Sequence, residues 1–135
     1  KAEITKVKKS GFVRFLGHVE DIKEVYESNH ITILPSWREG LSKSLIEAAA
    51  MEVPIITSNV PGCRDIIEDR VNGILVPVRD YKKIKLAIQF IFKNPKLAIK
   101  MAKLAREKVI NKFEVKLVNK ATISIYKNLL NQYKD

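Results

Sequence analysis

Two glutamates separated by seven residues have the side-chain chemistry and spacing to hold a polyhydroxylated ligand. Glu39 follows an apolar run that ends at Leu34, and Glu47 lies one turn into an amphipathic segment that begins around Ser42. A carboxylate accepts hydrogen bonds from paired hydroxyls, such as the vicinal diol of a ribose or the hydroxyls of a hexose. A helix N-terminus between them would offer unpaired N–H groups to an anion. The pattern fits a sugar-diphosphate site, and it also fits a capped helix with solvated acids.

The elements that would position these glutamates are those of a parallel sheet. Short apolar runs predict four strands, at residues 13–16, 31–34, 54–57 and 73–76. Between them, helices are predicted at residues 21–28, 44–51 and 62–68. This alternation predicts the α/β class, with a Rossmann-like parallel sheet flanked by helices. Ligands of such sheets bind outside the carboxyl ends of the strands, which is where the segment after Leu34 would lie.

Other local signals set the ends of elements. Residues 3–9 read as the end of a helix that leads to the first strand, and Asn72-Gly73, a dipeptide suited to positive φ, predicts a tight turn before the fourth. Asp80 can cap a helix, and Asn94-Pro95 ends that helix and starts another. Beyond Asp80, three apolar stripes at helical spacing are expected to face the core rather than a membrane; they run over residues 84–91, 97–109 and 115–130.

Length and composition indicate one ordinary globular domain. The chain has 135 residues, of which 46% are apolar and 30% charged, and it contains neither an apolar run of about twenty residues nor a signal-peptide pattern. Cys63 is the single cysteine, so an internal disulfide is excluded and a cytosolic setting is expected. We interpret Cys63 as a small residue in a turn rather than a nucleophile, since neither histidine is spaced to pair with it. No metal-ligand spacing is present, and no cofactor is expected.

The net charge of +10 is concentrated in the C-terminal part of the chain. Residues 1–78 carry ten basic and eleven acidic side chains, whereas residues 79–135 carry fifteen and four. A basic surface attracts anionic lipids, nucleic acid or an acidic partner, but a lysine-rich solvated surface explains the same composition. We expect no nucleic-acid partner, because aromatic residues are not interleaved with the lysine-rich helices.

Five blocks in the chain form an ordered pattern. The blocks are Phe15-Leu16-Gly17-His18-Val19, Leu34-Pro35-Ser36 with Glu39-Gly40 and Glu47-Ala48, Val53-Pro54-Ile55-Ile56, Pro61-Gly62 with Asp65-Ile66-Ile67, and Asn72-Gly73-Ile74-Leu75-Val76-Pro77. In this order they resemble the C-terminal, donor-binding domain of retaining GT-B glycosyltransferases, the large family of glycosyl transferases group 1 (family 4 type). The resemblance covers about residues 12–112 and includes an E-x(7)-E element formed by Glu39 and Glu47.

The resemblance implies a role for each matching position. Glu39 would be the catalytic residue beside the donor sugar and leaving phosphate, and Glu47 would hold the ribose hydroxyls. The turn Gly17-His18-Val19 would hold the nucleobase, and Gly62 would lie along the same cleft. The backbone N–H groups that would meet the sugar and diphosphate belong to Gly40, Leu41, Ser42, Lys43 and Ser44.

Some positions depart from the family pattern. Ser42 stands where many relatives have proline, and Glu52 stands where glycine is usual. The Arg and Lys that clamp the diphosphate in the family precede the region that matches. We therefore expect a single truncated nucleotide-sugar-binding domain over residues 1–135, without its acceptor-binding N-terminal domain and inactive by itself.

Within the family, residues 37–45 and 60–65 look like the branch that builds surface polysaccharides on lipid carriers. This resemblance implies a nucleoside-diphosphate sugar donor, with UDP expected as the nucleotide, and a hexosyl- or N-acetylhexosaminyltransferase. It also implies a lipid-linked or glycan acceptor and a cytoplasmic enzyme at the inner face of an anionic membrane. The alternatives are a sugar-nucleotide epimerase or a phosphorylase of the same architecture, or a basic nucleic-acid-binding module.

Overall fold

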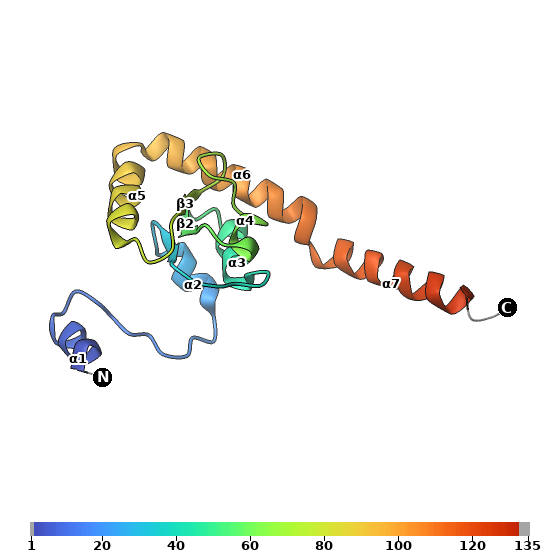
Figure 1. Ribbon diagram of the computed structural model, residues 1–135, viewed down its shortest axis with the longest axis horizontal. Coiled ribbons are helices and arrows are strands. Elements are labelled where there is room, and N and C mark those ends of the chain that lie inside the picture. Colours follow the sequence, from blue (N-terminus) through green and yellow to red (C-terminus); the bar gives the residue numbers. More distant parts are fainter. Residues whose placement is uncertain (1, 133–135) are drawn as a thin grey trace.

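A three-stranded parallel sheet forms the centre of the computed structural model, which describes residues 2–132 (Figure 1). The strands are β1 (Thr32–Leu34), β2 (Ile55–Ser58) and β3 (Ile74–Val76), and they pair in the order β1-β2-β3. Thr32 lies opposite Ile55, and Ile56 lies opposite Ile74. The predicted Rossmann-like parallel sheet flanked by helices is therefore confirmed for these strands.

Seven helices accompany the sheet in the described part of the chain. They are α1 (Ala2–Lys9), α2 (Ile22–Glu27), α3 (Lys43–Ala50), α4 (Pro61–Arg64), α5 (Tyr81–Lys93), α6 (Pro95–Phe113) and α7 (Val115–Gln132). Asp21 caps α2 by accepting from the Lys23 N–H, and Asp80 caps α5 by accepting from the Lys83 N–H, each at 2.9 Å. The predicted stop and restart at Asn94-Pro95 is also confirmed, because Pro95 is the first residue of α6.

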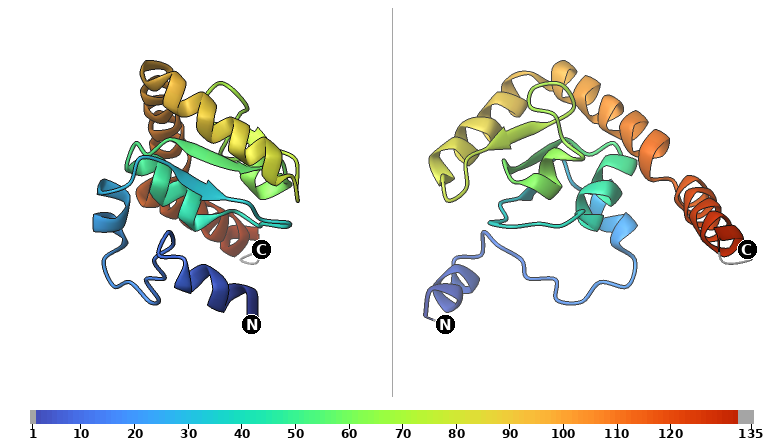
Figure 2. Two further views of the ribbon diagram at one scale, coloured as in Figure 1. Left: turned by 90° about the vertical axis from the view of Figure 1, so that its left-hand side faces the viewer. Right: turned by 45° about the vertical axis from the view of Figure 1, so that its right-hand side comes forward.

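The core has two apolar clusters, one on each face of the sheet. Because successive side chains of a strand point to opposite faces, Ile55 joins the cluster with α3, whereas Ile56 joins the cluster with α5. Helix α6 contributes to both, with Met101 in the second cluster and Ala105 in the first. Figure 2 shows α5 on one side of the sheet and α3 on the other.

The predicted strand at residues 13–16 is wrong. This segment is extended but pairs with no strand in the described part of the chain, and its side chains are exposed, including Val13, Phe15 and Leu16. A strand is defined by backbone hydrogen bonds to a neighbouring strand, and the described strands pair only among themselves. Apolar composition predicted the extended backbone but not the pairing.

The tight turn predicted at Asn72-Gly73 is present, but neither residue of this dipeptide has positive φ. The left-handed residue is Arg70, with φ 62°. The buried Asn72 side chain instead accepts from the Glu68 N–H at 2.7 Å and donates to the Ile66 carbonyl at 3.1 Å. These bonds also explain why the helix predicted to reach residue 68 ends at Arg64, since the Glu68 N–H bonds a side chain rather than a helical carbonyl.

The first two apolar stripes face the core as predicted, but the third does not. Ala87 and Ile91 of α5 and Met101 and Ala105 of α6 are buried. The described side chains of α7 are all exposed, because this helix projects away from the sheet (Figure 1). Among the described helices, none is long and apolar enough to span a bilayer.

Candidate functional site

Three loops meet at the edge of the sheet formed by the carboxyl ends of the strands. They are residues 35–42 after β1, residues 59–60 after β2 and residues 77–80 after β3. The Asn59 N–H donates to the Val76 carbonyl at 2.8 Å, which joins the second loop to β3. The guanidinium carbon of Arg79 lies 3.7 Å from the centroid of the Trp37 ring, which joins the third loop to the first. In open α/β sheets this edge is where ligands bind.

Glu39 is held in the first loop by a local hydrogen bond. The Ser36 hydroxyl donates to Oε1 of Glu39 at 2.5 Å, and the Glu39 side chain is half-buried. The second carboxylate oxygen has no described partner, so it can accept a hydrogen bond from a hydroxyl. The loop therefore orients one carboxylate at the edge of the sheet.

Gly62, at the start of α4, lies directly against this loop. A Cβ atom at Gly62 would be 1.6 Å from the Gly40 carbonyl oxygen and 2.7 Å from the Glu39 carbonyl oxygen. Only a residue without a side chain permits this approach of two backbones. Gly62 thus contacts the loop that carries Glu39 and Gly40 through its backbone, and its place along a donor cleft stays a prediction.

Cys63, the residue after Gly62 in α4, is fully buried. Its Sγ lies 3.1 Å from the Thr57 hydroxyl, which also donates to the Leu34 carbonyl at 2.8 Å. Burial raises the pKa of the Cys63 thiol, and the nearby Glu39 carboxylate raises that pKa further, whereas the contact with Thr57 lowers it. A buried neutral thiol is a poor nucleophile, in agreement with the interpretation of Cys63 as a small non-catalytic residue, but Cys63 lies in α4 rather than in the predicted turn.

The N-terminus of α3 keeps its first-turn N–H groups free of a side-chain cap. Ser42 is the N-cap residue, but its hydroxyl lies 3.1 Å from the Ser44 hydroxyl and makes no capping bond. The first N–H groups of a helix have no partner within the helix. Backbone donors at Lys43 and Ser44 can therefore meet an anion, in a region where the helix dipole favours negative charge.

Glu47 lies on an outer face of α3, one turn from these donors. Its Oε1 is 3.5 Å from Nζ of Lys43, and the pair is partly exposed. The hydroxyl of Tyr26 in α2 donates to the Ser44 carbonyl in the first turn of α3 at 3.1 Å. Burial raises the Tyr26 pKa, and the Glu47 carboxylate adds to this increase. Along the chain, Glu39 thus precedes and Glu47 follows the uncapped N-terminus of α3.

Gly17, His18 and Val19 are not joined to this edge by a hydrogen bond or ion pair of the described residues. Gly17 has φ 68°, and the chain bends at His18. The sequence analysis missed the contribution of Arg79. The sequence contained a signal for it. Arg79 follows β3 as closely as the candidate loop follows β1, and the loops that follow parallel strands lie at the same edge of the sheet.

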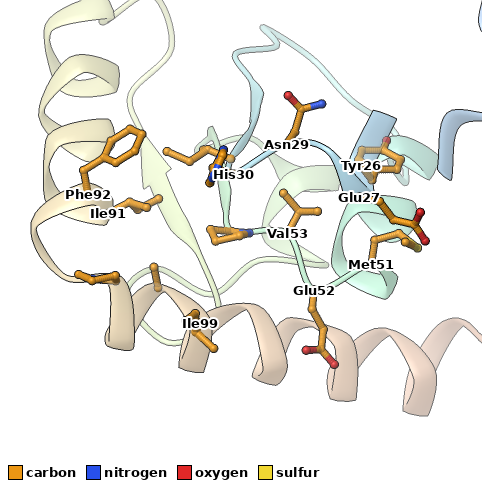
Figure 3. Close-up of a pocket in the computed structure, with 14 residues that line it drawn as sticks. Tyr26, Glu27, Asn29, His30, Met51, Glu52, Val53, Ile91, Phe92 and Ile99 are labelled. Carbon is orange, nitrogen blue, oxygen red and sulfur yellow. The ribbon is translucent and has the colours of Figure 1, made fainter. Parts of the chain in front are cut away.

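A separate cavity of about 490 Å³ opens at the opposite edge of the sheet (Figure 3). It lies between Val53 before β2 and the side chains of Ile91, Phe92 and Ile99 from α5 and α6. The lining is mainly apolar and contains the acidic Glu52, with no lysine or arginine to attract a diphosphate. No group of three or more metal-ligand side chains is present among residues 2–132.

Comparisons with known proteins agree with this architecture. The sequence profile of the family described as Glycosyl transferases group 1 matches residues 1–108. The chain is 31% identical over 120 residues to the capsular polysaccharide biosynthesis glycosyltransferase CapM of Staphylococcus aureus, covering 89% of this chain and 32% of that protein. It is 30% identical over 100 residues to UDP-Gal:alpha-D-GlcNAc-diphosphoundecaprenol alpha-1,3-galactosyltransferase of Escherichia coli, covering 74% and 26%.

A solved structure shows the same fold. Sucrose-phosphate synthase from Thermosynechococcus elongatus matches with a TM-score of 0.90 and 26% sequence identity, over 97% of this chain and 33% of that one. The chain therefore spans between about a quarter and a third of the length of these three proteins. Because the family profile covers most of the chain and the folds agree, this protein belongs to the glycosyl transferases group 1 family and has the parallel sheet and flanking helices of GT-B glycosyltransferases.

Proposed function

We propose that this chain binds the nucleoside-diphosphate sugar donor of a retaining glycosyltransferase, with UDP as the nucleotide. The observation that carries the proposal is the uncapped N-terminus of α3 between Glu39 and Glu47, at the carboxyl edge of the sheet. The family membership supports it, and the name of the Escherichia coli relative includes a UDP-sugar donor.

In this proposal each part of the edge has one task. The Glu39 carboxylate accepts from the donor sugar beside the leaving phosphate, and Glu47 accepts from the ribose hydroxyls. The N–H groups of residues 40–44 donate to the diphosphate and stabilise the negative charge that develops as it departs. Gly17, His18 and Val19 hold the nucleobase, an assignment that rests on the family resemblance alone.

The proposed acceptor is a lipid-linked glycan, and the proposed location is the cytoplasmic face of an anionic membrane. The name of the Escherichia coli relative includes a diphosphoundecaprenol acceptor. The lysines of α7 are exposed, and all three, Lys116, Lys120 and Lys127, line one shallow groove of this helix. Several such cations near a surface attract anionic headgroups.

Titration with UDP, GDP and glucose, followed by amide chemical shifts, tests the donor site. We expect UDP to shift residues 17–19 and 39–47, and Glu47→Ala to weaken UDP binding by about 1–3 kcal/mol, the cost of losing charged hydrogen bonds. Glu27→Ala is the matched control, because Glu27 pairs with Lys23 at 3.6 Å with the same helical spacing but lies outside the site. Shifts confined to the cavity around Val53 and Phe92, or equal losses in both variants, would reject the proposed site.

Sedimentation with vesicles tests the membrane partner separately. We expect binding to phosphatidylglycerol vesicles that decreases at high salt, since screening weakens attraction between charges. Replacement of Lys116, Lys120 and Lys127 by Gln should reduce this binding. Equal binding to anionic and neutral phosphatidylcholine vesicles would exclude an electrostatic membrane contact.

A further inference from the structure

The contact between Trp37 and Arg79 joins two loops that are distant in sequence and adjacent at the proposed donor site. Trp37 lies in the β1–α3 loop, two residues before Glu39, and its side chain is 66% exposed. Arg79 lies in the β3–α5 loop, and its guanidinium carbon is 3.7 Å from the Trp37 ring centroid. A guanidinium over an indole face is the most favourable cation–π pairing of natural side chains.

The backbone at Arg79 is unusual for a residue with a side chain. Its φ is 61°, in the left-handed region where glycine has no steric penalty and arginine does. The strain concerns only the backbone of Arg79, whereas its side chain contacts Trp37 in another loop at the carboxyl edge of the sheet. Strained residues of this kind are enriched at functional sites, where the surrounding structure maintains them.

We propose that Arg79 is a positioning residue for donor binding, which acts by holding Trp37 and thereby orienting the loop that carries Glu39 and Gly40. This inference rests on the proposed donor site. Other described contacts of the loop are the Ser36–Glu39 hydrogen bond within it and the approach of Gly62 beneath it. The contact with Arg79 restrains its outer part, and a loop ordered before binding loses less conformational entropy when the ligand arrives.

The decisive variant is Arg79→Gly, because it should lower the affinity for UDP-glucose without lowering the stability of the fold. Glycine removes the guanidinium and also relieves the left-handed strain, so the unfolding temperature should not decrease. Affinity for UDP-glucose should decrease about two- to fivefold, the size of one exposed cation–π contact. A purely structural role predicts that stability and affinity fall together.

Arg70→Gly is the matched control. Arg70 also has positive φ, 62°, and also lies over an aromatic ring, with its guanidinium carbon 4.4 Å from the Phe90 centroid. It precedes β3 and therefore lies at the opposite edge of the sheet. We expect this variant to change stability as Arg79→Gly does and to leave affinity for UDP-glucose unchanged.

Trp37 is the single tryptophan of the chain, so its fluorescence reports the contact without any ligand. Acrylamide should quench it more in Arg79→Gly than in the wild type or Arg70→Gly. Trp37→Phe should retain more affinity than Trp37→Ala, and Trp37→Ala combined with Arg79→Gly should lose no more than the larger single effect.

The outcomes separate this inference from the proposed function. Suppose that UDP-glucose binds and that Glu47→Ala weakens this binding. The positioning role is then rejected, and the donor site remains, if Arg79→Gly does not change the affinity or if the affinity losses of Trp37→Ala and Arg79→Gly are additive. If the wild type does not bind UDP-glucose, the proposed function is rejected, and the positioning role with it.

Discussion

At the scale of single residues, the two glycines at the carboxyl edge have different tasks. Gly62 is fully enclosed, and a Cβ there would overlap the Gly40 carbonyl oxygen at 1.6 Å. Gly40 is exposed, has no positive φ, and a Cβ there would meet nothing within 4 Å. The first glycine is required by packing between protein backbones, and the second leaves space on the solvent side of the loop.

This difference gives a paired prediction. Gly62→Ala should lower the free energy of unfolding by about 1–3 kcal/mol or more and displace the loop, since neither backbone can yield easily. Gly40→Ala should change it by less than about 0.5 kcal/mol, but should weaken UDP binding if the diphosphate approaches the loop backbone as proposed. Thermal unfolding and UDP titration of both variants provide the measurement. Equal stability of the two variants would contradict the assigned packing role.

At the scale of elements, the C-terminus of α3 shows how a departure from the family pattern is accommodated. Glu52 follows the C-cap Met51 and has φ 55°. The Val53 N–H donates to the Ala48 carbonyl and the Glu52 N–H donates to the Ala49 carbonyl, which is the Schellman arrangement. That arrangement requires a left-handed residue after the C-cap, and this explains why glycine is the usual residue at position 52.

Glu52→Gly is therefore expected to stabilise the chain by about 1 kcal/mol, or roughly 3–5 °C in unfolding temperature. The lost ion pair between Glu52 and Arg106, at 3.6 Å and partly exposed, offsets little of this gain. Glu52→Gln is the control, because it removes the ion pair and keeps the strain, and it should give no increase. A decrease for Glu52→Gly in a thermal unfolding experiment would show that the ion pair outweighs the strain.

At the scale of the whole molecule, the buried core ends before α7 begins. Buried residues of the two clusters extend from Tyr26 to Val109, and the partly buried Phe113 packs against the first cluster. In α7, Val118, Ile125 and Leu129 recur at helical spacing and are exposed, while Lys116, Lys120 and Lys127 line a groove on the same helix. This helix is amphipathic, yet its apolar side covers no part of the described core.

A chain that ends at Glu114 should accordingly keep its fold. Its free energy of unfolding should differ from that of the full chain by less than about 0.5 kcal/mol, because the described side chains of the removed segment are all exposed. A chain that ends at Lys93 is the control and should not fold, since it lacks Met101, Ala105 and Val109 of the core. Circular dichroism during thermal unfolding checks both, and loss of a cooperative transition on removal of α7 alone would contradict the prediction.

Local patterns in the sequence determined most elements of this protein. Apolar runs predicted β1, β2 and β3, and the capping residue Asp80 predicted the start of α5, because strand periodicity and helix caps depend on neighbours along the chain. The candidate loop could also be assigned to the carboxyl edge of the sheet, since a parallel strand sends its following loop there. The roles of Glu39 and Glu47 remain predictions that rest on the family pattern.

Only the tertiary structure decided which extended segment pairs and which loops meet. Residues 13–16 have strand composition but pair with no described strand, and positive φ occurs at Arg70 rather than at the Asn72-Gly73 dipeptide that is suited to it. The approach of Gly62 to Gly40 and the contact of Arg79 with Trp37 join residues that are far apart in the chain. Strand order in the sequence can assign these loops to one edge of the sheet, but which residues of the loops touch depends on how whole elements pack.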